Sequence, residues 1–551
     1  MNETVKLILE RYHKKKGERG QLDLLFEEIA EVLSPDRMGF TSRKRPERRT
    51  DKIFDTTPML AKRGLVNAIG SMLRPKSSAA GKWFDIVTED EDLMDKRAVK
   101  DWVDYAEERL WRALYNPKAR FIEATGEVDD DLVTFGTGVG YLGLRDDQAG
   151  FMFRSFHLAH TYIDTDTYGT INGVHVTETL TAKQAAERWG EENLGEKTRE
   201  KLTGANKDPN QKFEFVWCVK DRFDYDPRMS SNLNMPFSSI VVDIESEHLV
   251  IEEGFEEFPF FIPRWDTGDQ EYGRGVGVLA LPDVLTLQQM GKTMLRGLHR
   301  AVDPPWLLPA DSMVNAPQMK PGGVSYYDAK AIRNLGLTNP FQQMESRAQI
   351  PWGLNAQQAS REQVFQLFYR NVLNLPIEGP SMTATEVIER REMFVREISA
   401  VFGRLETDYT GVLIERAFNI MLRKGAFGSP EDIPEELQGS EINFRFASPV
   451  EKAKRQIEEA NITQGLEKAM AIGQVRPEVL DRFNWDEIAK FIATANDFPS
   501  QLTFDDDEVE SIKMNNAQAV QMQQGMAMAE QGANIASKVP AEMVEGEGLY
   551  D

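Results

Sequence analysis

Cysteine is almost absent from the 551-residue chain, which contains only Cys218. A single cysteine excludes an internal disulfide framework and a zinc site built from cysteines, and it is typical of a protein made in a reducing cytoplasm. Histidine is also scarce, with six residues. No apolar run approaches the roughly 18 residues of a membrane span, and the N-terminal segment, which carries Glu3 and a basic run at 14–16, is not typical of a signal peptide. We therefore expect no membrane contact and no cysteine-based metal site.

Basic residues are the minority among the charges. The chain has 65 Lys and Arg against 89 Asp and Glu, which gives a net charge of −24. Such an acidic surface repels phosphates, so any contact with nucleic acid must be local. With 41% hydrophobic and 28% charged residues, the composition indicates a globular chain of roughly three to four domains.

The first part of the chain has helical patterning. Apolar residues recur at helical spacing and predict helices near 22–34, 59–74 and 96–115. The strongly basic run at 41–49 lies between the first two. A solvated loop is the favoured interpretation of that run because like charges repel, and contact with phosphate is the alternative.

The pattern changes between about 133 and 265, where short apolar runs alternate with turn residues. This spacing predicts an antiparallel sheet, interrupted by helix only near 181–202. The segment FEEFPFFIPRW at 255–265 contains four phenylalanines and a tryptophan. Its two prolines are incompatible with a regular strand interior, and its apolar side chains need a surface to cover them.

A glycine-rich loop near 273–277 leads into a helix that we expect to run to about Val302. Pro282 and Asp283 are placed near its first turn, where a missing N–H and a negative charge are both tolerated. Lys292, Arg296 and Arg300 repeat every four residues and form a basic stripe along one side. The prolines at 304–305 end the helix.

A second helix is predicted near 355–373, followed by the proline-glycine loop LNLPIEGPSM at 373–382. The capping box Thr383 to Glu386 then opens a very long helix that continues to Lys424, with Gly403 as a candidate kink. A strand at 441–447, a helical unit at 449–496 and a tail rich in Gln, Ala and Met complete the chain.

Two phosphate-binding motifs are only superficially present. Gly138, Gly140 and Gly143 match GxGxxG, but a strand rather than a helix is predicted to follow them. Gly291-Lys292-Thr293 ends like a P-loop, yet it lies inside a predicted helix and cannot form a phosphate-binding loop. We expect neither a dinucleotide site nor an NTPase site.

Candidate metal ligands are equally weak. The segment 164–169 predicts a hairpin turn rather than a calcium loop, because the later ligand positions are wrong. His157 and His160 are expected to be structural residues in a strand, and the consecutive acids at 129–131 are expected to be solvated at a helix end. The sequence predicts no catalytic residue, no metal and no cofactor.

The order of these elements, together with YGRGVGVLALPDVLTLQQMGKTMLRGLHRAVDPPWLLP at 272–309 and GPSMTATEVIERR at 379–391, resembles the portal proteins, or head-to-tail connectors, of short-tailed bacteriophages. The resemblance extends from DTTPMLAKRGLVNAIGSMLRP at 55–75 to about residue 500. It implies an α+β portal fold rather than an enzyme fold.

The resemblance also divides the chain into the parts of a portal subunit. These are a wing of helices and antiparallel sheet (1–270), a first stem helix (271–302), a clip (303–353), a second stem helix (354–373), a tunnel loop (374–382), a long wing helix with its return strand (383–448), a helical crown (449–500) and a tail (501–551) that is either a barrel helix or disordered.

The implied function is mechanical. Portal proteins form a ring, typically of about twelve subunits, at one capsid vertex of the virion, after assembly in the host bacterial cytoplasm. The ring conducts double-stranded DNA during packaging and ejection. The implied partners are other copies of the chain, the major capsid protein and scaffold, the large subunit of the terminase motor, tail adaptor or tail tube proteins, internal core or ejection proteins, and DNA without sequence preference.

Particular residues acquire expected roles from this resemblance. In the tunnel loop, the residues expected to approach DNA are Leu375, Ile377, Glu378, Gly379 and Ser381. A plain connection between helices is the alternative for this loop. The basic stripe would either contact phosphates along the stem or pair with acids of the adjacent subunit. The apolar segment 255–265 is a candidate for the subunit interface.

The charge of the chain agrees with a conduit. Twelve copies at −24 each would total −288, and a mostly acidic wall lets a duplex slide without sticking. A scaffold or another internal virion protein is the alternative, although such a protein is expected to lack the central sheet and the helix pair bounded by prolines.

Overall fold

The structure, a computed structural model, describes most of the chain. Apart from isolated residues and single gaps at 227 and 230, the described ranges are 3–41, 50–75, 82–88, 96–145, 149–204, 207–268, 270–310, 318–328, 342–344, 349–370, 403–437, 442–446, 461–472, 482–495 and 511–516. The chain folds into two compact units. One unit comprises 1–84, 110–424 and 446–454, and the other comprises 85–109, 425–445 and 455–551.

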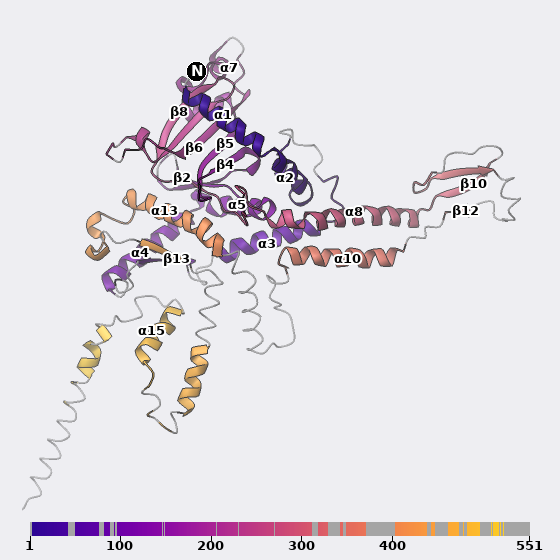
Figure 1. Cartoon of the computed structure of the whole chain (residues 1–551). Helices are drawn as coiled ribbons and strands as arrows, with labels where there is room; N and C mark the ends of the chain where they lie inside the picture. The colour runs from indigo at the N-terminus through magenta and orange to yellow at the C-terminus, as the bar shows by residue number, and fades with distance from the viewer. Residues whose placement is uncertain are drawn as a thin grey trace, which may run out of the picture. The chain divides into compact units, whose positions relative to one another are not determined.

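The first unit is built around two antiparallel sheets (Figure 1). The larger has the order β4-β5-β6-β7-β8 and consists of β4 (Thr161–Thr165), β5 (Ile171–Thr181), β6 (Lys212–Asp221), β7 (Phe237–Asp243) and β8 (His248–Phe255). The smaller has the order β3-β2-β9, with β2 (Gly140–Leu144), β3 (Phe151–Ser155) and β9 (Phe260–Phe261). Both confirm the predicted antiparallel arrangement.

The helical interruption of the sheet is also confirmed. The helices α6 (Ala182–Trp189) and α7 (Glu196–Thr203) lie between β5 and β6. A capping box begins α6: Gln184 N donates to Thr181 Oγ1 at 3.2 Å, and Thr181 N donates to Gln184 Oε1 at 3.0 Å. These two bonds satisfy amide groups that the first turn of a helix leaves unpaired. The segment 164–169 forms the β4–β5 turn, where Asp166 accepts from the amides of Tyr168 and Thr170.

The N-terminal helix, which the apolar pattern did not single out, covers the larger sheet. Helix α1 (Glu3–Glu18) buries Val5, Ile8, Leu9 and Tyr12 in one cluster with residues of β4, β6 and β7. Asp164, which is 2% exposed, anchors it by ion pairs to Arg11 at 2.9 Å and Lys15 at 3.2 Å. The helix therefore adheres by both apolar burial and charge.

The aromatic segment 255–265 lies inside the subunit, so its expected role as an exposed apolar surface is wrong. Phe260 and Phe261 are 2% and 1% exposed. Phe260 contacts Tyr141 and Trp217, with ring centroids 5.5 Å and 5.2 Å away. The segment finds its cover within its own chain because β9 pairs with β2 and turns the rings into the core.

The acids at 129–131 are likewise not a solvated cluster. Helix α5 (Phe121–Phe135) packs against α3 (Thr57–Leu73), β3 and α8 (Val276–Val302). This central position leaves Asp129 and Asp131 each 1% exposed. Asp129 pairs with Arg74, Asp130 with Lys62 at 2.6 Å, and Asp131 with Arg37 at 3.2 Å. Basic residues from two other segments meet these buried acids and partly offset the cost of their burial.

The helix that precedes the second unit is irregular at a place other than the expected kink. A π-helical turn at Glu406–Gly411 precedes α13 (Val412–Arg423), whereas Gly403 lies in an α-helical stretch. Tyr409 in the π-turn is fully buried, stacked on Phe261 at 5.6 Å between centroids. Its ring also lies 4.6 Å from the guanidinium carbon of Arg74. The packing of Tyr409 accounts for the extra residue in this turn.

The second unit contains a strand pair and helices. Strand β1 (Phe84–Thr88), which sequence analysis did not predict, pairs with the predicted return strand β13 (Ile442–Phe446). Helix α4 (Arg97–Leu114) matches the segment predicted at 96–115. Within the predicted helical unit at 449–496, residues 461–472 and α15 (Trp485–Ala495) are helical.

Candidate functional site

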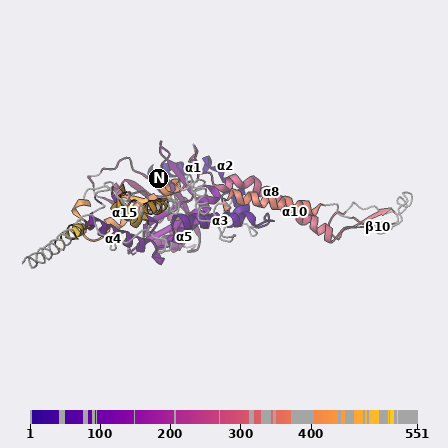
Figure 2. The same ribbon diagram turned by 90° about the horizontal axis from the view of Figure 1, so that it is seen from below.

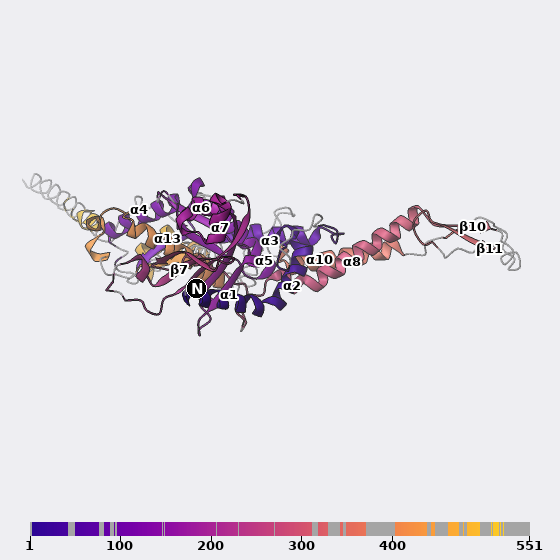
Figure 3. The ribbon, with the colours of Figure 1, turned by 90° about the horizontal axis from the view of Figure 1, so that it is seen from above.

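The candidate site is a helical hairpin in the first unit. Helix α8 (Val276–Val302) and helix α10 (Ile350–Leu367) pack side by side (Figure 1), and they extend in the same direction in the views of Figure 2 and Figure 3. The chain between them forms β10 (Trp306–Ala310), β11 (Val324–Asp328) and β12 (Gln342–Gln343). Strand β10 pairs with β11 in parallel and with β12 in antiparallel orientation. Two long helices thus carry a small sheet at their far end.

Helix α8 begins earlier than its proline suggested. We expected Pro282 near the first turn, but the helix starts at Val276 and Pro282 lies inside it. Four of the six helical residues ahead of the proline are buried, and a side chain at Gly277 would come within 2.2 Å of the carbonyl oxygen of Thr134 on α5. The four are Val276, Gly277, Ala280 and Leu281. Close packing of this apolar first turn outweighs the hydrogen bond that a proline removes.

Helix α10 is shifted relative to its prediction near 355–373. It begins at Ile350 with Pro351 in its first turn, a favoured position for proline, and it ends at Leu367. Tyr369 follows with a φ of 56°, a left-handed conformation that terminates the helix. The described part of this segment ends at Arg370.

The two helices meet the body of the unit at Asp55, whose side chain is 2% exposed. Its Oδ2 accepts from Gln357 Nε2 at 3.0 Å and from Arg361 Nε at 2.9 Å, both on α10. Gln288 on α8 donates from Nε2 to the carbonyl of Asp55 at 2.7 Å and accepts from its amide at 2.9 Å. Asp55 therefore forms hydrogen bonds with both helices and holds them to the body of the unit.

The charge of Asp55 is stabilised in this position. Burial alone would raise its pKa, but hydrogen bonds from Thr57 and from Arg361 outweigh that effect, and the pKa is lowered. The carboxylate is thus ionised near neutral pH. Sequence patterns do not point to this residue, because its partners on α8 and α10 lie 233 to 306 residues away in the chain.

The basic stripe is present on α8. Lys292 is half-buried, with its Nζ 5.5 Å from the ring centroid of Phe54. Arg296 and Arg300 are exposed, and neither forms a salt bridge with any residue in the described ranges. The hairpin therefore offers two guanidinium groups to a partner outside its own described chain.

The other predicted site residues fall elsewhere. The loop residues Leu375, Ile377, Glu378, Gly379 and Ser381 lie outside the described residues, as do the basic run 42–49 and the start of the predicted long helix.

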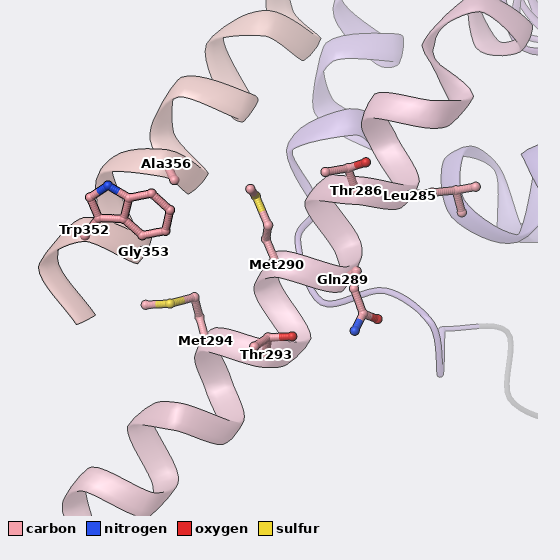
Figure 4. A pocket seen from close by; sticks show the side chains of 9 residues that line it. All are labelled: Leu285, Thr286, Gln289, Met290, Thr293, Met294, Trp352, Gly353 and Ala356. Carbon is pink, nitrogen blue, oxygen red and sulfur yellow. The ribbon is translucent and has the colours of Figure 1, made fainter. Parts of the chain in front are cut away.

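A shallow apolar groove runs between the two helices (Figure 4). Its volume is about 550 Å³, and its lining includes Met290 and Met294 of α8 with Trp352 and Ala356 of α10. Gly353 permits this approach, because a side chain there would come within 2.4 Å of Met294 Sδ. Trp352 is 72% exposed. The groove has no titratable lining residue and is unsuited to catalysis.

Buried titratable groups outside the hairpin are structural. Burial lowers the pKa of His157 to about 3 and that of His175 to about 4, and it raises the pKa of Cys218 to about 12. His160 lies in the 3₁₀ turn Leu158–His160 rather than in the expected strand, and His157 caps that turn, with its Nδ1 accepting from Ala159 N at 2.9 Å. Among the described residues, no three His, Cys, Asp or Glu side chains are grouped to hold a metal ion.

The glycine motifs fold as expected. Gly140 and Gly143 lie in β2, which leads to β3 rather than to a helix. Gly291-Lys292-Thr293 lies within α8. Neither segment forms the loop that a phosphate group requires.

The architecture defines a structural protein class: an α+β body from which a helix pair with a small terminal sheet extends. Residues 5–503 match the family described as bacteriophage head to tail connecting protein, and the chain belongs to this family. The resemblance inferred from the sequence is confirmed. A scaffold protein, the alternative interpretation, is not supported.

Two curated relatives match over nearly the whole chain. The portal protein of Salmonella phage epsilon15 is 26% identical over 558 residues, covering 98% of this chain and 96% of its own. The probable portal protein of Bordetella phage BPP-1 is 27% identical over 541 residues, covering 97% and 95%. Among solved structures, chains of the virion and of the neck of a gene transfer agent particle align with 74% of this chain and 89% of theirs, at 10% and 11% identity and a TM-score of 0.33.

Membership of this family makes the chain a head-to-tail connector, a virion component located at the capsid vertex. The family is one of structural particle components. In the part of the chain that the structure describes, each helix is too short or too polar to cross a membrane.

Proposed function

We propose that copies of this chain assemble into a closed ring, of about twelve subunits, which conducts double-stranded DNA through the portal vertex. The hairpin of α8 and α10 carries this proposal. It is a long projection, bound at its root by Asp55 and bearing exposed cations on an otherwise acidic chain. Family membership supports the same assignment.

The parts of the portal subunit are assigned as follows. The helices and sheets up to residue 270 form the wing, α8 and α10 form the stem, and β10 to β12 form the clip. Residues 374–382 form the tunnel loop. Helix α13 and strand β13 belong to the long wing helix and its return strand. The crown comprises 449–500, and the terminal tail comprises 501–551.

The exposed cations on α8 interact with a group outside their own subunit. One candidate is the phosphate backbone, to which arginine binds without sequence preference. The other is an acid of the adjacent subunit, whose pairing would strengthen the ring. The net charge of −24 per chain keeps the rest of the wall repulsive to DNA, which allows the duplex to move.

The clip is proposed to bind the packaging motor first and tail adaptor proteins afterwards. The motor supplies the ATP hydrolysis, since no described residues of this chain form an NTPase loop. Major capsid protein, scaffold and internal core or ejection proteins are proposed partners of the wing and crown.

The ring is tested by negative-stain electron microscopy of the purified full chain, with native mass spectrometry on the same sample. Rings with one subunit stoichiometry and a central hole wide enough for a duplex are expected. A protein that stays monomeric at all salt concentrations, even with capsid protein and scaffold present, would contradict the proposal.

A further inference from the structure

A second groove lies in the second unit. It is formed by α4 and the segment 427–435 and has a volume of about 560 Å³. Its aromatic lining residues are Trp102, Tyr105 and Phe427. The rings of Trp102 and Phe427 meet at 65° with centroids 6.1 Å apart, and Arg109 Nη1 donates to the carbonyl of Ala426. Phe427 is 2% exposed, so the aromatic floor is built into the unit.

The rim of this groove is acidic. Asp101, Glu431, Asp432 and Glu435 line it, and no lysine or arginine does. Asp432 is partly engaged, because it accepts from Ser429 N at 2.7 Å and from Ser429 Oγ at 3.0 Å. Glu431 and Glu435 are exposed and form no salt bridge with any residue that the structure describes. Two carboxylates thus face solvent beside an aromatic surface.

Tyr105 already contacts one guanidinium group, that of Arg109 on the same helix. The guanidinium carbon of Arg109 lies 5.2 Å from the ring centroid of Tyr105, within cation–π range. Tyr105 nevertheless remains 44% exposed and available to a second cation. Trp102 is only 7% exposed and, with Phe427, forms the apolar floor of the groove.

We propose that this groove is a docking site for an arginine- or lysine-rich segment of a partner protein. Its side chains would lie over the exposed tyrosine and pair with Glu431 and Glu435. The acidic rim repels phosphates, which excludes nucleic acid as the occupant. The volume exceeds that of a single side chain and suits a short peptide. The proposal does not depend on ring formation, since every lining residue comes from one subunit.

The experiment uses the full-length protein and a fluorescein-labelled octapeptide of alternating arginine and leucine, followed by fluorescence anisotropy at physiological ionic strength. We expect saturable binding of one peptide per chain. The double variant Glu431→Gln/Glu435→Gln should weaken binding by about tenfold or more, and Tyr105→Leu by about threefold or more. A peptide with glutamate in place of arginine should not bind.

The matched control is Glu191→Gln/Glu192→Gln, which removes two exposed acids from the turn at Glu191–Asn193. It changes the net charge equally and should alter the affinity less than about twofold. Equal weakening by both double variants would mean general attraction to an acidic protein and would overturn the proposal, as would the absence of saturation. Circular dichroism verifies folding, and native mass spectrometry records the oligomeric state of each variant, so failure to form rings is registered separately.

Discussion

Asp55 accepts a hydrogen bond from Nε of Arg361 at 2.9 Å across 306 residues of chain. The contact joins the loop before α3 to α10, while Gln288 joins the same residue to α8. Asp55 therefore links both helices of the hairpin to the body of the unit. Several predictions about stability and assembly rest on this and on three other buried or exposed sites.

Replacement of Asp55 by Asn should reduce the free energy of unfolding by about 1–3 kcal/mol, because the charged hydrogen bond to Arg361 is lost in a buried setting. Urea unfolding at pH 7 measures the change. Asp283→Asn is the control: Asp283 accepts from Gln363 at 3.1 Å on the exposed side of the same hairpin, and its replacement should cost less than about 0.5 kcal/mol. Similar losses in both variants would contradict the role of Asp55.

The pH dependence of the Asp55 contribution has a defined sign. Its folded-state pKa is lowered by the hydrogen bonds that outweigh burial, so its stabilising contribution is present above the unfolded value of about 3.9. The contribution is lost as the pH falls through the lowered pKa. The difference between wild type and Asp55→Asn should therefore shrink below about pH 4. A difference that grows on acidification would contradict this sign.

Asp131 should show the opposite behaviour. Burial raises its pKa to about 7, and Arg37 at 3.2 Å offsets this only in part. The native state then retains a proton that the unfolded chain releases above about pH 4, so this group lowers stability as the pH rises from about 4 to 7. We expect Asp131→Asn to gain on the order of 2–4 kcal/mol relative to wild type between pH 4.5 and pH 8. Denaturant unfolding of both proteins at three pH values measures this difference in stability. Parallel dependences of the unfolding free energy on pH in wild type and Asp131→Asn would contradict the prediction.

Tyr409 tests the π-helical turn. Truncation to Ala removes a fully buried ring that stacks on Phe261 and covers Arg74, and it should cost about 3–5 kcal/mol. Tyr409→Phe keeps the ring and loses the hydroxyl, with its hydrogen bond to Thr125 O at 3.3 Å and its interaction with Asp129, at about 1 kcal/mol. Tyr168→Ala, at a 92% exposed position, serves as the control in thermal melts. An alanine variant as stable as the phenylalanine variant would show that the ring is not needed there.

Arg296 and Arg300 should matter to the assembly and not to the subunit. Because both are exposed and have no salt bridge within the described chain, Arg296→Gln/Arg300→Gln should change the unfolding free energy of a subunit by less than about 0.5 kcal/mol. In assembled rings we expect a clear effect in one of two measurements. Weaker duplex binding with a reduced salt slope indicates phosphate contact, whereas rings that dissociate at lower salt indicate pairing between subunits. If the variant leaves both duplex binding and ring dissociation unchanged, both proposed roles are wrong.

Much of the fold was predictable because local patterns carry it. The alternating runs of β5 to β7, the end of α8 before Pro304 and the helices near 22–34 and 59–74 follow from side-chain period and from proline and glycine. The long motifs at 272–309 and 379–391 identified the family. These features depend on residues that are close together in the sequence, so they can be predicted without knowledge of the tertiary structure.

The errors share one cause, which is burial decided by distant residues. Asp129 and Asp131 were expected in solvent, and Arg74 and Arg37 instead meet them inside the protein. The aromatic run at 255–265 was expected at an interface, and β2 and Tyr409 cover it. The spacing of apolar residues in the sequence does not reveal which distant residues become partners in the folded chain.

The sequence alone determined the class of this protein: the order of its elements, the antiparallel sheet, the hairpin with its basic stripe, and the connector family. Only the tertiary structure decided which charges are buried, where α8 and α10 begin, and that Asp55 binds both helices. The physical reason is the distance along the chain over which each effect acts. Helix and strand propensity act over a few residues, whereas desolvation and ion pairing depend on groups that meet only when the chain has folded.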